Sequence, residues 1–255
     1  MSTINTNVFK EQVAVVTGAS SGIGKAIALE LAAQGAKLCL LGRNLESLFA
    51  IAKRCSQSET AKIAQETSPQ ARCYQLDLTS DEDIRQFKAH VDKDYGQVNL
   101  LIHSAGVYSL GEVKTACVKD FDLQYRTNVR APYILTQALL PKLISSQGQV
   151  VFINSTAGLI AKAGVSQYAA TKHALKAIAD SLRDEVNTSG VRVLTVFPGN
   201  TASPMQAAIC EMLGKPYNPE RLIQPEDVAS VVVHTLSLPR TAEVTEIKVR
   251  PFLKS

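Results

Sequence analysis

Seven short, almost continuously apolar segments constrain the fold of this chain more than any other feature, because longer segments with helical spacing of apolar residues separate them. Strands that are apolar on both faces are typical of parallel sheets covered by helices on each side. The alternation therefore predicts an α/β architecture, with one doubly wound parallel sheet of about seven strands. The predicted strands are residues 13–16, 37–41, 71–76, 100–103, 150–154, 191–197 and 244–249.

One domain accommodates the whole chain of 255 residues, of which 45% are hydrophobic and 20% are charged. We expect a short tail over residues 1–9 and a single domain over residues 10–255. The polar segment 55–70 is predicted to extend a helix into a surface loop. Residues 201–221 follow a predicted strand and are expected to form a mobile cover, because apolar residues recur there at near-helical spacing: Met205, Ile209, Met212 and Leu213.

Charge and cysteine content exclude several classes of protein. The net charge is only +4 and the basic residues are scattered, so the chain lacks the electrostatic stripe that binds nucleic acid. The five cysteines are odd in number and have no Cys-x-x-Cys spacing, which favours free buried thiols in a reducing compartment. Neither a leader-like start nor a run of roughly 18 uncharged apolar residues is evident. We expect a cytoplasmic protein without nucleic-acid or membrane partners.

The histidines give no sign of a metal site. His90, His173 and His234 lie on predicted helices, with no cysteine or carboxylate at metal-binding spacing. We therefore expect the chain to hold no metal ion.

A glycine-rich motif over residues 17–24 directly follows the first predicted strand and opens an alanine-rich helix. Glycines at such a turn let the backbone approach a pyrophosphate closely, and the helix N-terminus offers free N–H groups and partial positive charge. The motif predicts a dinucleotide site, and the alternative is a turn used only for strand–helix packing. The predicted cofactor contacts are Gly18, Ser20, Ser21, Gly22, Ile23 and Gly24.

The end of the second predicted strand indicates which dinucleotide would bind. An acidic residue at this place binds the ribose 2′-hydroxyl of NAD, whereas a basic residue accommodates the 2′-phosphate of NADP. This chain has Arg43 and no acid there, which favours NADP; otherwise Arg43 is a solvated surface charge. Asp77, at the end of the third strand, is placed to meet the adenine or, alternatively, to cap a turn.

Tyr168 and Lys172 lie one helical turn apart, and no other tyrosine of the chain has a lysine four residues later. A nearby ammonium favours the phenolate, so this spacing predicts a tyrosine pKa below the usual value of about 10. Ser155, thirteen residues before Tyr168, ends a predicted strand at the sheet edge where ligands bind. Its hydroxyl is placed to hold a carbonyl oxygen beside the tyrosine, or else to cap the next turn.

Five motifs in register resemble the short-chain dehydrogenase/reductase family of the roughly 250-residue type, over residues 10–250. They are Thr-Gly-x3-Gly-x-Gly, Tyr-x3-Lys, the serine thirteen residues upstream, Asn128 on the preceding long helix, and Pro198-Gly199 after the sixth strand. The resemblance implies a single-domain Rossmann-like fold. It also implies that Tyr168 is the general acid/base and that Ser155 orients the carbonyl.

The same resemblance assigns further roles. Lys172 would bind the nicotinamide ribose and lower the tyrosine pKa, and Asn128 would hold a water that relays protons to Lys172. The sequence departs from the family at His103-Ser104, where the family usually has two asparagines, so we expect His103 to be structural and the backbone contacts to persist. The further cofactor contacts implied are Leu78, Ala105, Gly106, Tyr168, Lys172, Pro198, Gly199, Thr201 and Ser203, with Thr201 and Ser203 as alternatives for the carboxamide contact.

These observations lead to an expected function. We expect an NADP(H)-dependent oxidoreductase that interconverts a carbonyl and a secondary alcohol on a small or medium, mostly apolar substrate, because residues 107–110, 157–160 and 205–213 contain no Lys or Arg. A 3-hydroxy acid dehydrogenase or 3-oxoacyl reductase is the alternative, and the C-terminal sequence looks more like the branch that contains 3-hydroxy acid and other broad carbonyl reductases. For a 3-hydroxy acid, Lys162 or Arg126 would reach the site. A non-catalytic dinucleotide-binding sensor is the alternative from a different class.

We expect a homotetramer, because relatives pair through their long helices and last strand. One such helix is more apolar than a single covered face requires, at Ala131, Ile134, Leu135, Ala138 and Leu139.

Overall fold

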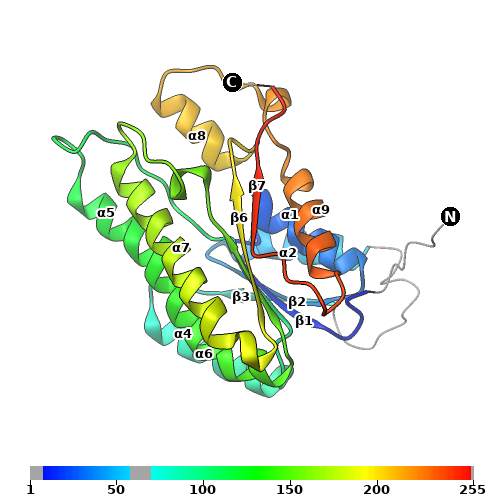
Figure 1. Cartoon of the computed structure of the whole chain (residues 1–255). Helices are drawn as coiled ribbons and strands as arrows, with labels where there is room; N and C mark the ends of the chain where they lie inside the picture. Colours follow the sequence, from blue (N-terminus) through cyan, green and yellow to red (C-terminus); the bar gives the residue numbers. More distant parts are fainter. Residues whose placement is uncertain (1–7, 58–69, 254–255) are drawn as a thin grey trace.

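The computed structural model describes residues 8–57 and 70–253, which contain a seven-stranded, entirely parallel sheet (Figure 1). The strands are β1 (Val13–Thr17), β2 (Lys37–Gly42), β3 (Ala71–Gln75), β4 (Leu100–His103), β5 (Gln149–Ile153), β6 (Arg192–Pro198) and β7 (Glu246–Val249). Their order in the sheet is β3-β2-β1-β4-β5-β6-β7. This confirms the predicted doubly wound sheet, with strand ends that differ from the predicted ones by one or two residues.

Helices cover both faces of this sheet. They are α1 (Gly22–Ala33), α2 (Leu45–Cys55), α4 (Asp81–Asp94), α5 (Val118–Tyr125), α6 (Ala131–Ser145), α7 (Ser166–Val186), α8 (Pro204–Met212) and α9 (Pro225–Leu236). α1, α2 and α9 pack on one face, and α4, α6 and α7 pack on the other (Figure 1). α5 leads into α6 through a π-helical turn, Arg126–Arg130.

The central strand β1 shows how the two layers form. Ala14 and Val16 pack with the layer that contains α1, while Val13 and Val15 pack with the layer that contains α6, and none is more than 2% exposed. Successive side chains of a strand point to opposite faces, so an uninterrupted apolar run serves both layers. Fully burying a side chain the size of valine contributes about 1.5–3 kcal/mol, which fixes the sheet and the positions of its strand ends.

Two helices begin at residues whose side chains cap the helix. Ser80 caps α4, where its hydroxyl accepts a hydrogen bond from the Asp83 N–H at 3.2 Å. Gln224 and Asp227 form a reciprocal capping box at the start of α9. Both caps supply partners for N–H groups that a helix end leaves unpaired.

Several details differ from the sequence-based expectations. Phe9, which we expected in the tail, is fully buried in the core. Cys117 is exposed rather than buried, although all five cysteines are free.

α2 ends at Cys55, and residues 58–69 of the predicted loop lie outside the described residues. The predicted apolar residues of α6 turn inward, because Leu135 and Leu139 are fully buried.

Candidate active site

The carboxyl ends of the strands open into a cavity of about 980 Å³. It lies where the strand order reverses between β1 and β4, the place where doubly wound sheets bind ligands. Most of the predicted site residues line this cavity, and Gly24 and Asn128 do not. Those that do are Gly18, Ser20, Ser21, Gly22, Ile23, Arg43, Asp77, Leu78, Ala105, Gly106, Ser155, Tyr168, Lys172, Pro198, Gly199, Thr201 and Ser203.

The β1–α1 turn approaches its neighbours too closely for any side chain. Gly18 has a φ of +65°, and a Cβ atom at this position would lie 2.8 Å from Cα of Ala105. A Cβ atom at Gly24 would lie 2.5 Å from the carbonyl oxygen of Gly18. Glycine is therefore required at both positions. Gly24 was predicted to contact the cofactor, but it packs the helix against the turn and does not line the cavity.

The N-terminus of α1 is open to an anion. Ser21 is the N-cap residue, yet its side chain makes no capping hydrogen bond, and the first turn of α1 contains no acidic residue. Unpaired N–H groups and the positive end of the helix dipole thus meet the cavity without an internal carboxylate to neutralise them.

Thr17 joins the glycine-rich turn to the loop after β4. Its hydroxyl accepts hydrogen bonds from the N–H groups of Ser104 and Ala105, at 3.0 and 3.1 Å, and donates to the carbonyl of Ile102 at 3.3 Å. The sequence analysis missed this role, although Thr17 opens the glycine-rich motif. The three bonds hold Ala105 against Gly18, so they set the width of the crevice.

Arg43 and Asp77 line the cavity from the ends of β2 and β3. Both side chains are exposed, and the carbonyl of Arg43 accepts a hydrogen bond from Gln75 Nε2 at 2.9 Å. Asp77 Oδ1 accepts bonds from the N–H and the hydroxyl of Thr79, at 2.8 and 2.9 Å. Asp77 therefore caps the turn before α4, one of the two predicted alternatives, while its carboxylate also borders the cavity.

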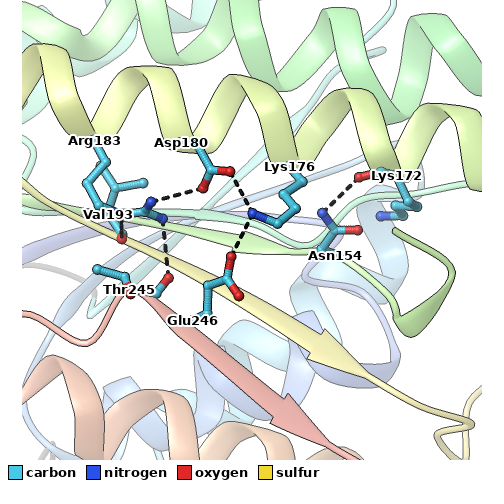
Figure 2. A network of polar contacts seen from close by, with 8 residues as sticks. All are labelled: Asn154, Lys172, Lys176, Asp180, Arg183, Val193, Thr245 and Glu246. Atoms are coloured by element: carbon cyan, nitrogen blue, oxygen red, sulfur yellow. Dashed lines mark hydrogen bonds and ion pairs between the residues drawn. The ribbon is translucent and has the colours of Figure 1, made fainter. Parts of the chain in front are cut away.

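Ser155 lies directly after β5 and is held by its neighbour Asn154. The Ser155 N–H donates to Asn154 Oδ1 at 2.8 Å, and Asn154 Nδ2 donates to the carbonyl of Lys172 at 3.0 Å (Figure 2). Asn154 is buried, and sequence reasoning missed it. Its carboxamide fixes the serine relative to α7, the helix that carries Tyr168.

The hydroxyl of Ser155 has two partners. Its oxygen accepts a hydrogen bond from the Ala157 N–H at 3.2 Å, and the side chain is also hydrogen-bonded to Tyr168. The predicted cap therefore occurs, and the same hydroxyl also lies beside Tyr168, whereas its hold on a carbonyl oxygen stays a prediction.

α7 is anchored to the sheet at a second point, further from the cavity. Lys176 forms ion pairs with Asp180 and with Glu246 of β7, at 2.6 and 2.7 Å, and Arg183 donates to the carbonyl of Val193 at 3.1 Å (Figure 2). These partly exposed pairs contribute modestly to stability, but together with Asn154 they fix the helix that carries Tyr168 and Lys172.

Tyr168 and Lys172 are both buried at the edge of the cavity. Lys172 Nζ lies 5.7 Å from the centre of the Tyr168 ring and donates a hydrogen bond to the carbonyl of Ile153 at 3.1 Å. Burial lowers the pKa of Lys172 to about 8, because a buried ammonium loses its hydration.

The pKa of Tyr168 moves in the direction opposite to the predicted one. Burial raises it to about 12, and the hydrogen bond to Ser155, which lowers it, is the smaller effect. The prediction relied on the neighbouring ammonium and left out the loss of hydration that the surrounding elements impose on the phenolate. In this structure the phenol of Tyr168 is therefore protonated throughout the neutral range.

Asn128 lies in the π-helical turn between α5 and α6 and faces the loop after β4. Its Oδ1 accepts a bond from the Val107 N–H at 2.8 Å, and its Nδ2 donates to the Val107 carbonyl at 2.9 Å and to the Thr171 hydroxyl at 3.2 Å. π-Helical turns are frequent at functional sites, because they redirect one side chain. Here Asn128 fastens the Val107 loop to α7 from behind the cavity.

Tyr108 and Gln124 are further residues that sequence reasoning did not single out. The Tyr108 ring packs edge-on against that of Tyr168, with centroids 4.8 Å apart. Gln124 of α5 is fully buried, accepts from the Ser109 N–H and donates to Gln167 Oε1, both at 3.3 Å. The residue before Tyr168 is thus tied to the loop that carries Tyr108. No sequence signal marked this link, because it joins three distant segments.

His103 has the structural role that the sequence suggested. The ring is buried, stacks on Phe152 at a centroid distance of 4.9 Å, and shares a hydrogen bond of 2.8 Å with the Thr136 hydroxyl. Burial lowers its pKa to about 3. A neutral imidazole that does not line the cavity is a core residue.

Thr201 and Ser203 both line the cavity, next to the segment over its mouth. The Thr201 hydroxyl donates to the Gly199 carbonyl at 3.0 Å, and Ser203 caps α8 by accepting from the Gln206 N–H at 3.2 Å. α8 lies over the carboxyl end of β6 (Figure 1). Met205, Ile209 and Leu213 add apolar surface to the lining.

A comparison with known families identifies the family of this chain. A family model for short chain dehydrogenases matches residues 12–214. The chain belongs to this family. An uncharacterized oxidoreductase of Staphylococcus epidermidis is 32% identical over 243 residues, which are 95% of this chain and 98% of the relative. Membership makes the chain an oxidoreductase of a family that uses nicotinamide dinucleotides.

Solved structures of the family superpose over nearly the whole chain. An alcohol dehydrogenase from the archaeon Thermococcus sibiricus, complexed with 5-hydroxy-NADP, has a TM-score of 0.84 and 26% identity over 96% of this chain and 98% of its own. A metagenomic short-chain oxidoreductase in complex with NADP has a TM-score of 0.80 and 30% identity over 97% and 100%.

Among residues 8–57 and 70–253, no helix combines the length and apolarity needed to cross a membrane. The same part of the chain contains no group of three or more His, Cys, Asp or Glu side chains placed to hold a metal ion.

Proposed function

We propose that this chain is an NADP(H)-dependent oxidoreductase that interconverts a carbonyl and a secondary alcohol. The observation that carries the proposal is the meeting of Ser155, Tyr168 and Lys172 at one edge of the cavity. A serine hydroxyl bonded to a buried phenol makes a pair of donors for a carbonyl oxygen, and the phenol has a proton to give at neutral pH.

The residues at the switch point fit a dinucleotide. The close approach of Gly18 to Ala105 and the uncapped N-terminus of α1 provide a narrow, positively polarised site for a pyrophosphate. Arg43 lines the same cavity at the end of β2, where its guanidinium is placed for a 2′-phosphate. The NADP complexes of two structural relatives support the same choice. When bound, the nicotinamide would supply or accept the hydride.

The chain's own groups then handle the proton. Hydride addition places negative charge on the carbonyl oxygen, so that oxygen needs a hydrogen-bond donor in the transition state. Tyr168 would donate its phenolic proton, Ser155 would hold the oxygen, and Lys172 would bind the nicotinamide ribose. In alcohol oxidation the same phenol acts in reverse as the base.

The apolar walls suggest the body of the substrate. Besides Tyr168 the lining includes the apolar residues Val107, Leu123, Ile160, Val165, Met205, Ile209 and Leu213. We propose a small or medium substrate with a mostly apolar body, whose burial contributes about 25 cal/mol per Å². The free cysteines also favour a reducing cytoplasm as its location.

An assay of the purified protein tests this function directly. Ketones, 3-oxoesters and 3-hydroxy acids would be offered with NADPH or NADP, and with NADH or NAD in parallel, while nicotinamide absorbance is followed. We expect reduction of at least one ketone or 3-oxoester with NADPH. If the protein binds NADPH but turns over no carbonyl or alcohol, the proposed activity is wrong and a non-catalytic dinucleotide-binding sensor is the better interpretation.

A further inference from the structure

Basic residues outnumber acidic ones in the lining of the cavity. Among the described residues that line the cavity, Asp77 is the one carboxylate, and it lies with Arg43 near the ends of β2 and β3. Lys162 and Lys215 also line the cavity, on segments that contribute no carboxylate to the lining. Both are exposed.

The segment that carries Lys162 is held in place. Lys162 lies in the loop between Ser155 and α7, two residues before Gly164. The Gly164 carbonyl accepts a hydrogen bond from the Gly111 N–H at 2.9 Å, which ties this loop to the one after β4. Apolar lining residues, Ile160 and Val165, flank Lys162 on either side. The ammonium therefore lies at the border between apolar wall and solvent.

The backbone of Lys215 is fixed by the end of α8. The Gly214 N–H bonds to the Glu211 carbonyl at 3.0 Å, the Lys215 N–H bonds to the Cys210 carbonyl at 2.9 Å, and Gly214 has a φ of +61°. This is the Schellman arrangement that ends helices. Acidic residues of the same segment, Glu211 and Glu220, are exposed and do not line the cavity. This segment therefore contributes Lys215 to the lining and neither of these carboxylates.

We propose that the substrate carries an acidic group, a carboxylate or a phosphate, at the end opposite its carbonyl, and that Lys162 and Lys215 bind this group at the cavity mouth. The apolar body lies against Ile160, Ile209 and Leu213 between the two ends. This inference rests on the proposed function and names its substrate class. It adds an acidic end to the mostly apolar substrate expected from the sequence. Of the two cations left open by the sequence it selects Lys162, since Arg126 does not line the cavity.

Electrostatics sets the size of the expected effect. One exposed ion pair contributes little, because water and salt screen it. Two cations that bind one acidic group contribute more. The apolar body of the substrate displaces water from the site, so water screens the charges less. We expect a preference of about 10- to 100-fold in kcat/KM for an acid over its neutral ester, and a strong decrease of this preference with added salt.

The experiment compares matched acids and esters. Oxo carboxylic acids with two to six carbons between ketone and carboxylate, their methyl esters, and the corresponding phosphate monoesters of hydroxyketones would be reduced with saturating NADPH. The readout is the ratio of kcat/KM for acid over ester at each chain length. The phosphate series shows which acidic group the site favours.

Charge reversal locates the effect. In Lys162→Glu and Lys215→Glu we expect the acid/ester ratio to fall at least tenfold, whereas Lys93→Glu, an exposed site on α4 outside the lining, retains the wild-type ratio. A wild-type ratio near one at all lengths for both acid types overturns this proposal, as does a preference that survives both reversals. Either result leaves the proposed function intact as long as the esters are reduced.

Discussion

Lys172 lies one helical turn beyond Tyr168, with its Nζ 5.7 Å from the centre of the tyrosine ring. Burial acts on both groups and moves their pKa values apart, because it raises that of the phenol to about 12 and lowers that of the ammonium to about 8. Near pH 7 the phenol is protonated and the lysine is still charged. This is the protonation state that carbonyl reduction requires.

Replacing Tyr168 by Phe removes the proton donor and preserves the ring. We expect kcat for reduction to fall about 10²- to 10⁴-fold, the usual contribution of a general acid. NADPH affinity, measured by calorimetry, should change little, because the ring packing against Tyr108 is kept. A variant with near wild-type kcat on the best substrate contradicts the assignment.

Removing the hydroxyl of Ser155 should shift a pH profile. Alcohol oxidation needs the phenolate of Tyr168, so kcat/KM at saturating NADP should rise with pH. The hydrogen bond to Ser155 lowers the pKa of Tyr168, and Ser155→Ala loses it. The rising limb should therefore move to higher pH in the variant. Stopped-flow or steady-state profiles between pH 6 and 11 measure this, and an unmoved or downward-shifted limb refutes the contact.

Arg43 should determine the choice of cofactor. Arg43→Ala is expected to weaken NADPH binding by about 1.5–3 kcal/mol, the range for a hydrogen bond to a charged group, with little change for NADH. Arg54→Ala, an exposed arginine of α2 outside the cavity lining, serves as the matched control. Fluorescence titration of both cofactors gives the affinities. Equal wild-type affinity for NADH and NADPH is incompatible with this role.

His103 should make the protein sensitive to acid. Its pKa is lowered to about 3 by burial, against about 6.5 in the unfolded chain, so between these values the unfolded state binds a proton that the folded state does not. Above pH 6.5 the imidazole is neutral in both states, so His103 does not lower the free energy of unfolding. As the pH falls from 6.5 toward 3, that free energy decreases by up to ~1.4 kcal/mol per pH unit.

The variant His103→Leu isolates that contribution. Urea unfolding at pH 7, 5.5 and 4.5 should show a shallower loss of unfolding free energy on acidification in the variant than in the wild type. Parallel losses in the two proteins would show that His103 is not the group responsible.

We propose that the chain assembles as a homotetramer. The outer surface of α6 exposes Tyr133 and Ile144, at 52% and 39%, and the adjacent α5 exposes Leu123 and Tyr125. Light scattering at micromolar concentration should give about four times the chain mass of 27.5 kDa. Tyr133→Glu, which places a charge in this surface, should lower the mass. A wild-type monomer mass rules out the assembly.

The order of elements and the spacing of motifs could be read from the sequence. The apolar runs predicted the sheet, and the glycine-rich turn and Ser155 were expected at strand ends, where they line the cavity together with Tyr168 and Lys172. These features are local, because strand period, helical spacing and turn glycines depend on neighbours within a few residues. Their meeting follows from the topology of a parallel sheet, whose strands all end at the same edge.

The chemical state of the site depended on contacts between distant segments. The sequence by itself placed Tyr168 beside Lys172, but only the tertiary structure buried them both and so raised the tyrosine pKa. The packing of Tyr108 on Tyr168 and the charge of Lys162 at the cavity mouth were likewise decided by loops that meet only in the folded chain. The free-energy cost of a charge depends on the hydration of the group, and hydration depends on every segment that surrounds the group. Spacing along the chain specifies only the neighbours in sequence.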